Sequence, residues 1–114
     1  MLHHIGIIID DMDKYVEIFT KLGGIVKSDS IAKEFAARCV FIDFYNTFIE
    51  LIQSTEPNTH LTKFIQKYGV GLHHLAFLSQ NDGSFKDGAI EGMKVKFNKP
   101  GKDCRILIEE VDFK

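Results

Sequence analysis

The sequence contains few of the residues that mark special classes of protein. It has no tryptophan, two prolines and two cysteines in 114 residues, and no apolar run approaches the length of a membrane span. Cys39 and Cys104 lack the paired spacing of zinc or redox motifs, so we interpret both as reduced core residues, with a disulfide left open. No basic region with an apolar leader precedes the first strand pattern. We therefore expect a cytoplasmic protein with no membrane partner.

Blocks of like charge are also absent. The chain has 14 basic and 16 acidic side chains, a formal charge of -2, and no long run of either sign. Phosphate backbones are bound by a basic face, which this composition does not obviously supply, so we expect no nucleic-acid partner. Hydrophobic residues make up 45% of the chain, and 114 residues are enough for one domain with a core.

The most informative feature of the sequence is a repeated phrase. Residues 2–8 read Leu-His-His-Ile-Gly-Ile-Ile, and residues 72–78 read Leu-His-His-Leu-Ala-Phe-Leu. The residue classes follow in the same order, which indicates a duplicated unit. Each copy alternates small and large apolar residues after its histidines, a pattern typical of a buried strand.

Strand alternation separates the two histidines of each pair. His4 shares a face with Gly6, and His74 shares a face with Ala76, whereas the first histidine of each pair lies with large apolar residues. Small neighbours leave room for a ligand. We therefore predict that His4 and His74 reach a shared metal site and that His3 and His73 pack against helices.

The remaining elements follow from periodicity and from turn residues. Aspartates precede an amphipathic helix at about residues 12–22, and Gly23-Gly24 ends it. Residues 30–37 suit either a helical turn or a loop. The other expected elements are strands at 25–29, 39–45 and 47–53 with a turn at Asn46, a helix at 60–68, a strand at 72–78, a weak helix at 84–93, and strands at 94–98 and 105–111 about a turn at 100–103.

This order predicts an α+β fold in a single domain, residues 1–114. Module one covers about residues 1–55, a linker helix covers about 58–68, and module two covers about 70–114. Module one has the order β-α-β-β-β. Module two has one strand fewer by this count.

Two glutamates stand out within apolar strands. Glu50 shares its face with Phe48 and Ile52, where an ionised carboxylate is costly unless a cation is near. Glu109 shares the face of Leu107 in the last strand. The alternative is that both glutamates simply face water. Two imidazoles and two carboxylates would suit a divalent ion such as zinc, nickel, cobalt, manganese or iron, with open positions for a substrate that chelates through two oxygens.

The motifs resemble the vicinal oxygen chelate superfamily, which comprises the glyoxalase, bleomycin-resistance and dioxygenase folds. The residues that carry the resemblance are His-Ile-Gly-Ile in the first strand, the acidic helix start, Phe48–Ile52, and Gly71–Phe77. Nearly the whole chain is covered, and within the superfamily the sequence is most similar to methylmalonyl-CoA epimerases. The resemblance implies paired βαβββ modules that form an incomplete barrel around a divalent metal.

The resemblance also implies residue roles. The metal ligands would be His4, Glu50, His74 and Glu109, and the acid and base would be Glu109 and Glu34. The implied activity is that of an epimerase or isomerase, which acts on a small acyl thioester through a metal-stabilised enolate in a homodimer. The alternatives are a glyoxalase I-like lactoylglutathione lyase and a non-catalytic small-molecule-binding member of the fold. A ring-cleaving dioxygenase is disfavoured, since those enzymes use a different ligand set.

The C-terminus departs from the family pattern. Epimerase-like members continue with two strands after the proline-containing turn, but here one strand pattern remains. If residues 105–111 form the final strand, that strand carries Glu109. If they form the penultimate strand, the fourth ligand is missing.

Overall fold

The computed structural model describes residues 1–102 and 104–113, so Asp103 of the predicted turn lies outside the described residues. Within these ranges no helix combines the length and apolar character that crossing a bilayer requires. The elements are β1 (Leu2–Ile8), α1 (Met12–Lys21), β2 (Ile25–Ala32), the 3₁₀ turn η1 (Lys33–Phe35), β3 (Ala37–Asp43), β4 (Phe48–Ser54), α2 (His60–Tyr68), β5 (Gly71–Leu78), β6 (Lys86–Asp87), β7 (Met93–Asn98) and β8 (Leu107–Phe113).

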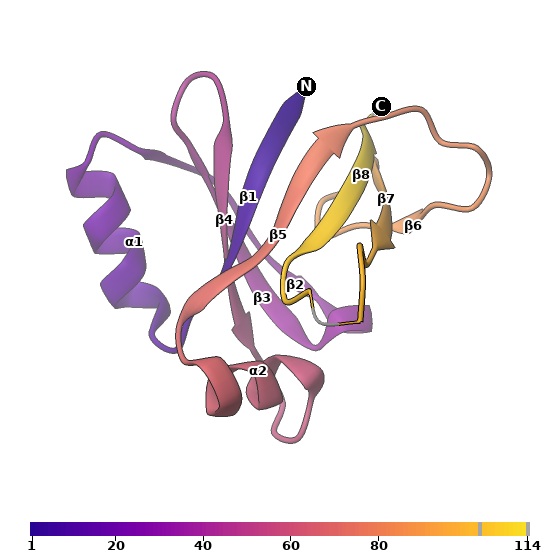
Figure 1. The fold of residues 1–114 in the computed structure, drawn as a ribbon. Helices are drawn as coiled ribbons and strands as arrows, with labels where there is room; N and C mark the ends of the chain where they lie inside the picture. Colours follow the sequence, from indigo (N-terminus) through magenta and orange to yellow (C-terminus); the bar gives the residue numbers. More distant parts are fainter. Residues whose placement is uncertain (103, 114) are drawn as a thin grey trace.

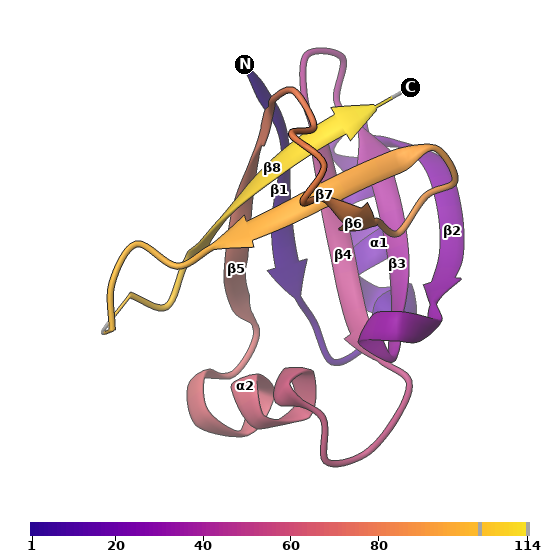
Figure 2. The same cartoon turned by 90° about the vertical axis from the view of Figure 1, so that its right-hand side faces the viewer.

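The strands form one mixed sheet that curls into a half-barrel (Figure 1, Figure 2). Its order is β2-β3-β4-β1-β5-β8-β7-β6. β1 runs parallel to β4, and β5 runs parallel to β8, while β1 and β5 pair antiparallel at the centre. The sheet therefore consists of two four-stranded modules with the same internal pairing, joined at the two strands that carry the repeated phrase.

Helix α1 covers the outer face of the first module. Asp11 caps the helix, because its side-chain oxygen accepts a hydrogen bond from the Lys14 N–H at 3.2 Å. Its apolar stripe packs on β3 and β4, and the side chains in this cluster are Ile9, Met12, Tyr15, Val16, Phe19, Val40, Ile42 and Leu51. Helix α1 therefore covers the outer face of these strands, and their inner face is available for a functional site.

Helix α2 closes one end of the half-barrel (Figure 1). Thr59 caps it by accepting a hydrogen bond from the Thr62 N–H at 3.2 Å, and its bounds match the predicted helix at 60–68. Leu61 is buried against an inner cluster with Ile8, Cys39 and Ile52. Both cysteines are free, as expected; Cys39 is buried, whereas Cys104 is only partly buried and is not a core residue.

The predicted helix at 84–93 is wrong. This segment contains the two-residue strand β6, and Gly92 adopts a positive φ of 84°, which breaks a helix. At Gly88 an added β-carbon would meet the Met93 Cε atom at 2.6 Å and the Val95 Cγ1 atom at 3.0 Å, so the chain lies close to β7 here. In the described part of module two there are therefore four strands and no helix, so the module does not lack a strand.

The predicted hairpin turn is shifted by one residue. Tyr45 adopts the left-handed backbone with a φ of 79°, and Asn46 does not. The Tyr45 N–H donates to the Asp43 side chain at 2.8 Å, which stabilises this turn locally. The hairpin of β3 and β4 itself is confirmed.

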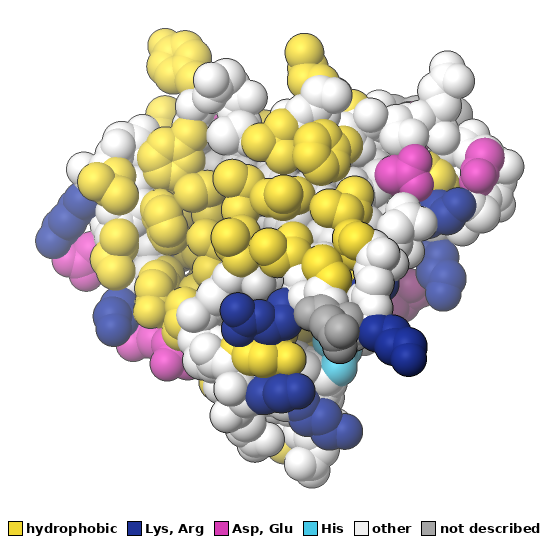
Figure 3. Space-filling model, viewed as in Figure 1, with side chains coloured by type: hydrophobic (Ala, Val, Ile, Leu, Met, Phe, Trp, Pro, Cys, Tyr) yellow, Lys and Arg dark blue, Asp and Glu magenta, His cyan; other side chains and the backbone are white. Residues whose placement is uncertain are grey.

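Among the described residues, no helix covers the outer face of the second module as α1 covers the first. Several large apolar side chains are exposed there and at the strand ends, and Figure 3 shows a broad apolar surface over this side of the sheet. The exposed residues of β5 are Leu72, Phe77 and Leu78.

Candidate metal centre

Four buried polar side chains meet on the inner face of the sheet, and each module supplies two of them. His4 on β1 and Glu50 on β4 come from the first module, and His74 on β5 and Glu109 on β8 come from the second. The register is equivalent in both, because Gly6 lies opposite Glu50 and Ala76 lies opposite Glu109. β8 is the final strand and runs parallel to β5, so Glu109 faces the site.

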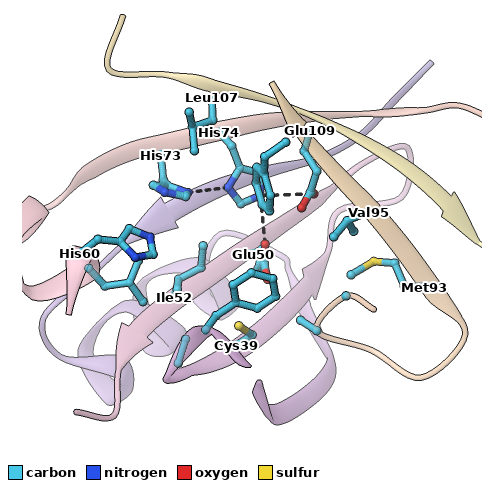
Figure 4. Close-up of a pocket in the computed structure, with 16 residues that line it drawn as sticks. Cys39, Glu50, Ile52, His60, His73, His74, Met93, Val95, Leu107 and Glu109 are labelled. Carbon is cyan, nitrogen blue, oxygen red and sulfur yellow. Dashed lines mark hydrogen bonds and ion pairs between the residues drawn. The ribbon is translucent and has the colours of Figure 1, made fainter. Parts of the chain in front are cut away.

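The donor atoms of these side chains converge. The His4 Nε2 atom lies 3.0 Å from the His74 Nε2 atom, 3.3 Å from Glu50 Oε1 and 2.9 Å from Glu109 Oε1. The His74 Nε2 atom lies 3.2 Å from Glu50 Oε1 and 3.5 Å from Glu109 Oε1. Figure 4 shows Glu50, His74 and Glu109 pointing toward one another from three strands.

Small residues make room for the two imidazoles. Across the central strand pair, Gly6 lies opposite His74 and Ala76 lies opposite His4. A β-carbon at Gly6 would lie 2.2 Å from the His74 Cε1 atom, which no real structure tolerates. The small residues identified in the repeated phrase therefore create the space that the histidine rings occupy.

Two β-bulges place His3 and His73, which we call the outer histidines, beside His4 and His74, which we call the inner histidines. The register between β1 and β5 shifts between Leu2 and His4 and again between Gly6 and Ile7. His3 is the extra residue of the first bulge, and His73 is the extra residue of the second. A bulge breaks the strict alternation of faces. His73 packs against His60 and Phe64 of α2, as predicted, but it also lines the inner cavity instead of lying on the opposite face of the sheet.

Each outer histidine forms a hydrogen bond to the Nδ1 atom of the neighbouring inner histidine, which is the ring nitrogen that does not face the cluster. The Nδ1 atoms of His3 and His4 lie 2.7 Å apart, and those of His73 and His74 lie 2.8 Å apart. Burial, followed by the inner histidine's charge, lowers the pKa of His3 to about 4 and that of His73 to about 3, so both accept hydrogen bonds as neutral rings. With an ion bound, each inner Nδ1–H would donate to the neighbouring outer ring, which would leave the inner Nε2 lone pair for the ion.

The cluster has an unusual charge balance. Burial alone would lower the pKa of His4, but hydrogen bonds to Glu109 and Glu50 outweigh it and raise this pKa to about 9. Burial alone would raise the pKa of Glu50, but hydrogen bonds from His4 and His74 hold it well below its usual range. Glu109 Oε1 is buried without an aligned hydrogen-bond donor among the described residues. A positive charge is therefore favoured at the centre.

A divalent ion fits this arrangement. With bonds of about 2.1 Å from metal to nitrogen or oxygen, neighbouring ligand atoms lie roughly 3.0 to 3.4 Å apart. The five donor separations span 2.9 to 3.5 Å. Donor atoms of His4, Glu50 and His74 all lie within 4.8 Å of one another, and Glu109 joins them through both histidines. Nitrogen and carboxylate donors suit zinc, nickel, cobalt or manganese.

A cavity of about 220 Å³ opens onto the carboxylate side of the cluster. Glu50, His74 and Glu109 lie at its base, and its walls are mainly apolar, formed by Phe35, Ile52, Met93, Val95, Phe97 and Leu107 (Figure 4). Cys39 also lines the cavity. Burial raises the pKa of the Cys39 thiol well above its usual range, so this cysteine is no thiolate nucleophile.

The other predicted site residue lies apart from this cluster. Glu34 is exposed on η1, and its neighbour Phe35, not Glu34 itself, lines the cavity. Sequence reasoning missed His60 and His73 as cavity residues. The repeated His-His pair could have identified His73 as a cavity residue. No sequence pattern around His60 indicated that it lies at the cavity.

Residues 3–106 match the family described as the Glyoxalase/Bleomycin resistance protein/Dioxygenase superfamily. A comparison with curated protein sequences found no match.

Solved structures of similar fold cover almost the whole chain. A hypothetical protein from Bacillus halodurans C-125 is 23% identical with a TM-score of 0.89, covering 100% of this chain and 94% of the other. Methylmalonyl-CoA epimerase from Mycobacterium tuberculosis is 21% identical with a TM-score of 0.88, covering 99% and 87%. A Streptomyces coelicolor methylmalonyl-CoA epimerase variant, in complex with 2-nitronate-propionyl-CoA, is 24% identical with a TM-score of 0.84, covering 98% and 96%. At these identities the likeness establishes the fold.

The first prediction concerns Gly6. We expect Gly6→Ala to displace the His74 ring, lower Ni²⁺ affinity at least tenfold by calorimetry, and cost about 1 to 3 kcal/mol of unfolding free energy through overpacking. Gly71→Ala is the matched control, since its β-carbon would meet only Phe64 Cε1 at 3.9 Å. Equal metal affinity in the two variants would contradict the placement of His74.

The second prediction concerns the outer histidines. Loss of the His73 hydrogen bond frees the His74 ring to turn, so we expect His73→Ala to weaken Ni²⁺ binding by about 10- to 100-fold. His60→Ala serves as the control, because His60 lines the same cavity and forms no hydrogen bond to an inner histidine in the described residues. If His73→Ala lowers the melting temperature with metal affinity intact, the role of His73 is packing alone.

Proposed function

The chain belongs to the glyoxalase/bleomycin resistance protein/dioxygenase superfamily, and we propose that it is a metal-dependent epimerase or isomerase of a small acyl thioester. The observation that carries the proposal is the buried set of two imidazoles and two carboxylates at the base of an apolar cavity. The fold shared with methylmalonyl-CoA epimerases supports the same class of reaction.

His4, Glu50, His74 and Glu109 would hold the divalent ion. When bound, such an ion acts as a Lewis acid that stabilises the negative charge which develops on a carbonyl oxygen during proton removal. The outer pair His3 and His73 keeps the inner rings in one tautomer and orientation. These residues would therefore position the substrate carbonyl, and the ion that they hold would make the proton on the neighbouring carbon more acidic.

Proton transfer is assigned to carboxylates. Glu109 lies at the cavity base, and we assign proton removal to the carboxylate oxygen of Glu109 that would not hold the ion. Epimerisation also needs a proton returned to the opposite face of the same carbon. Glu34, one residue from the cavity wall at Phe35, is our candidate for that second group.

The shape of the cavity supports a small acyl group. Its volume of about 220 Å³ is modest, and apolar walls surround the carboxylates and His74. An apolar wall excludes water and so strengthens electrostatic interactions with the reacting carbonyl. The acyl portion of the substrate would occupy this cavity.

Two other functions fit the same fold. A glyoxalase I-like lactoylglutathione lyase would use the same metal ligands and the same proton transfer on a hemithioacetal. A non-catalytic member that only binds a small molecule does not require two buried glutamates opposite two histidines. The cost of burying these carboxylates favours the catalytic reading.

The expectations of a homodimer and of a cytoplasmic location remain predictions. Exposed apolar residues of β5, namely Leu72, Phe77 and Leu78, mark the surface on which a second copy would pack.

The third prediction is the direct test of this function. With Co²⁺ or Ni²⁺ added, the protein should exchange the hydrogen next to the carbonyl for deuterium, measured by NMR over a panel of acyl-CoA and glutathione thioesters. Glu109→Gln should lower the exchange rate by about 10² or more, and Glu34→Gln should lower the rate of epimerisation by a similar factor. Glu110→Gln is the control, because Glu110 bonds Ser79 and Asn98 away from the cavity.

The panel also separates the candidate functions. Exchange in acyl-CoA substrates supports the epimerase, and exchange confined to the glutathione thioesters supports the lyase. Metal binding with no exchange in any member of the panel would contradict both enzyme readings.

A further inference from the structure

A second cavity adjoins the first one. Its volume is about 460 Å³, and it shares His73 and Leu107 with the cavity above the metal cluster. The end of α2 supplies one wall, and the segment between β7 and β8 supplies the other. The two cavities therefore meet at His73 and Leu107, and we call the second one the basic groove.

The basic groove collects positive charge in a chain whose net charge is -2. Its lining includes Lys67, Lys99, Lys102 and Arg105, and no aspartate or glutamate is among the described lining residues. Within residues 1–102 and 104–113, none of these four cations forms a salt bridge, whereas Lys21, Arg38, Lys94 and Lys96 all do. Figure 3 shows the Lys and Arg side chains gathered around the end of α2.

Tyr68 brings two of these cations together. The Lys67 Nζ atom lies 5.2 Å from the centre of the Tyr68 ring, and the Arg105 Cζ atom lies 4.9 Å from it. The aromatic ring attracts each cation, but two like charges at one ring repel each other. The partial negative charge at the helix C-terminus accounts for Lys67 but not for the cations of the β7–β8 segment. An anionic ligand in the groove would relieve this repulsion.

We propose that the basic groove binds the phosphate groups of the thiol carrier, so that the protein selects a coenzyme A thioester over a glutathione one. This inference rests on the proposed function, in which the acyl group lies above the metal cluster. The thioester arm would then pass His73 and Leu107 and end among the four cations.

The chemistry of the two carriers distinguishes them. In a coenzyme A thioester a long, flexible arm separates the sulfur from several phosphate charges, and such an arm can run from one cavity into the next. Glutathione carries its carboxylates close to the sulfur, so they would remain near the apolar first cavity. Arginine pairs well with phosphate oxygens, and lysine binds them as a point charge.

The fourth prediction tests the groove by binding alone. Calorimetry on the protein without metal compares coenzyme A with pantetheine, which lacks the phosphates. We expect coenzyme A to bind at least tenfold more tightly, an advantage that shrinks as salt rises. The double variant Lys67→Gln/Arg105→Gln should remove most of this advantage and leave pantetheine binding unchanged.

The matched control is Lys14→Gln/Lys27→Gln, which removes the same charge from exposed positions outside the groove. Lys14 also lies over a tyrosine ring, at 5.4 Å from the centre of Tyr15. Equal binding of coenzyme A and pantetheine, or equal losses in the two double variants, would overturn the proposal. Because no turnover is measured, a protein that binds coenzyme A through the groove but exchanges no deuterium would refute only the proposed function. A protein that exchanges deuterium in acyl-CoA equally well in both double variants would refute only the groove.

Discussion

The structure depends on one electrostatic constraint, which is that two buried carboxylates must share a site with a cation. Glu50 and Glu109 are almost fully buried and face His4 and His74 at distances of 2.9 to 3.5 Å. Burial of a single ionised carboxylate is costly, and burial of two together is costlier still. In the protein without metal, the raised pKa of His4 places a proton there. A divalent ion would offset both charges and use both imidazoles.

The duplicated modules satisfy this constraint by repeating one register. Each module places a histidine on its first strand and a glutamate opposite the small residue two positions later, Gly6 in one case and Ala76 in the other. The central pairing of β1 with β5 then sets each histidine against the small residue of the other module. Two bulges at equivalent positions add the outer histidines, so the hydrogen bonds that orient the inner rings are repeated as well.

Sequence patterns were informative where side-chain direction follows from strand alternation. The faces of His4, His74, Glu50 and Glu109 all followed from which neighbours were small or apolar, and the family match and the shared fold agree with the predicted superfamily. Alternation failed at His73, because a bulge is set by the pairing of two strands and is not visible in either strand alone. The helix expected at 84–93 failed because this segment pairs with β7 through β6 and turns at Gly92 with a positive φ. The basic groove joins α2 to a segment about thirty residues later, so only the tertiary fold reveals it.

X-ray absorption spectroscopy of the Ni²⁺-loaded protein tests the central claim most directly, since it reports the atoms bound to the metal. The account predicts one ion per chain, a first shell of nitrogen and oxygen at about 2.0 to 2.2 Å, and multiple scattering from two imidazole rings. Substitution of either inner histidine by alanine should remove one of these rings. A spectrum with no imidazole scattering, or one that both substitutions leave unchanged, would contradict the account.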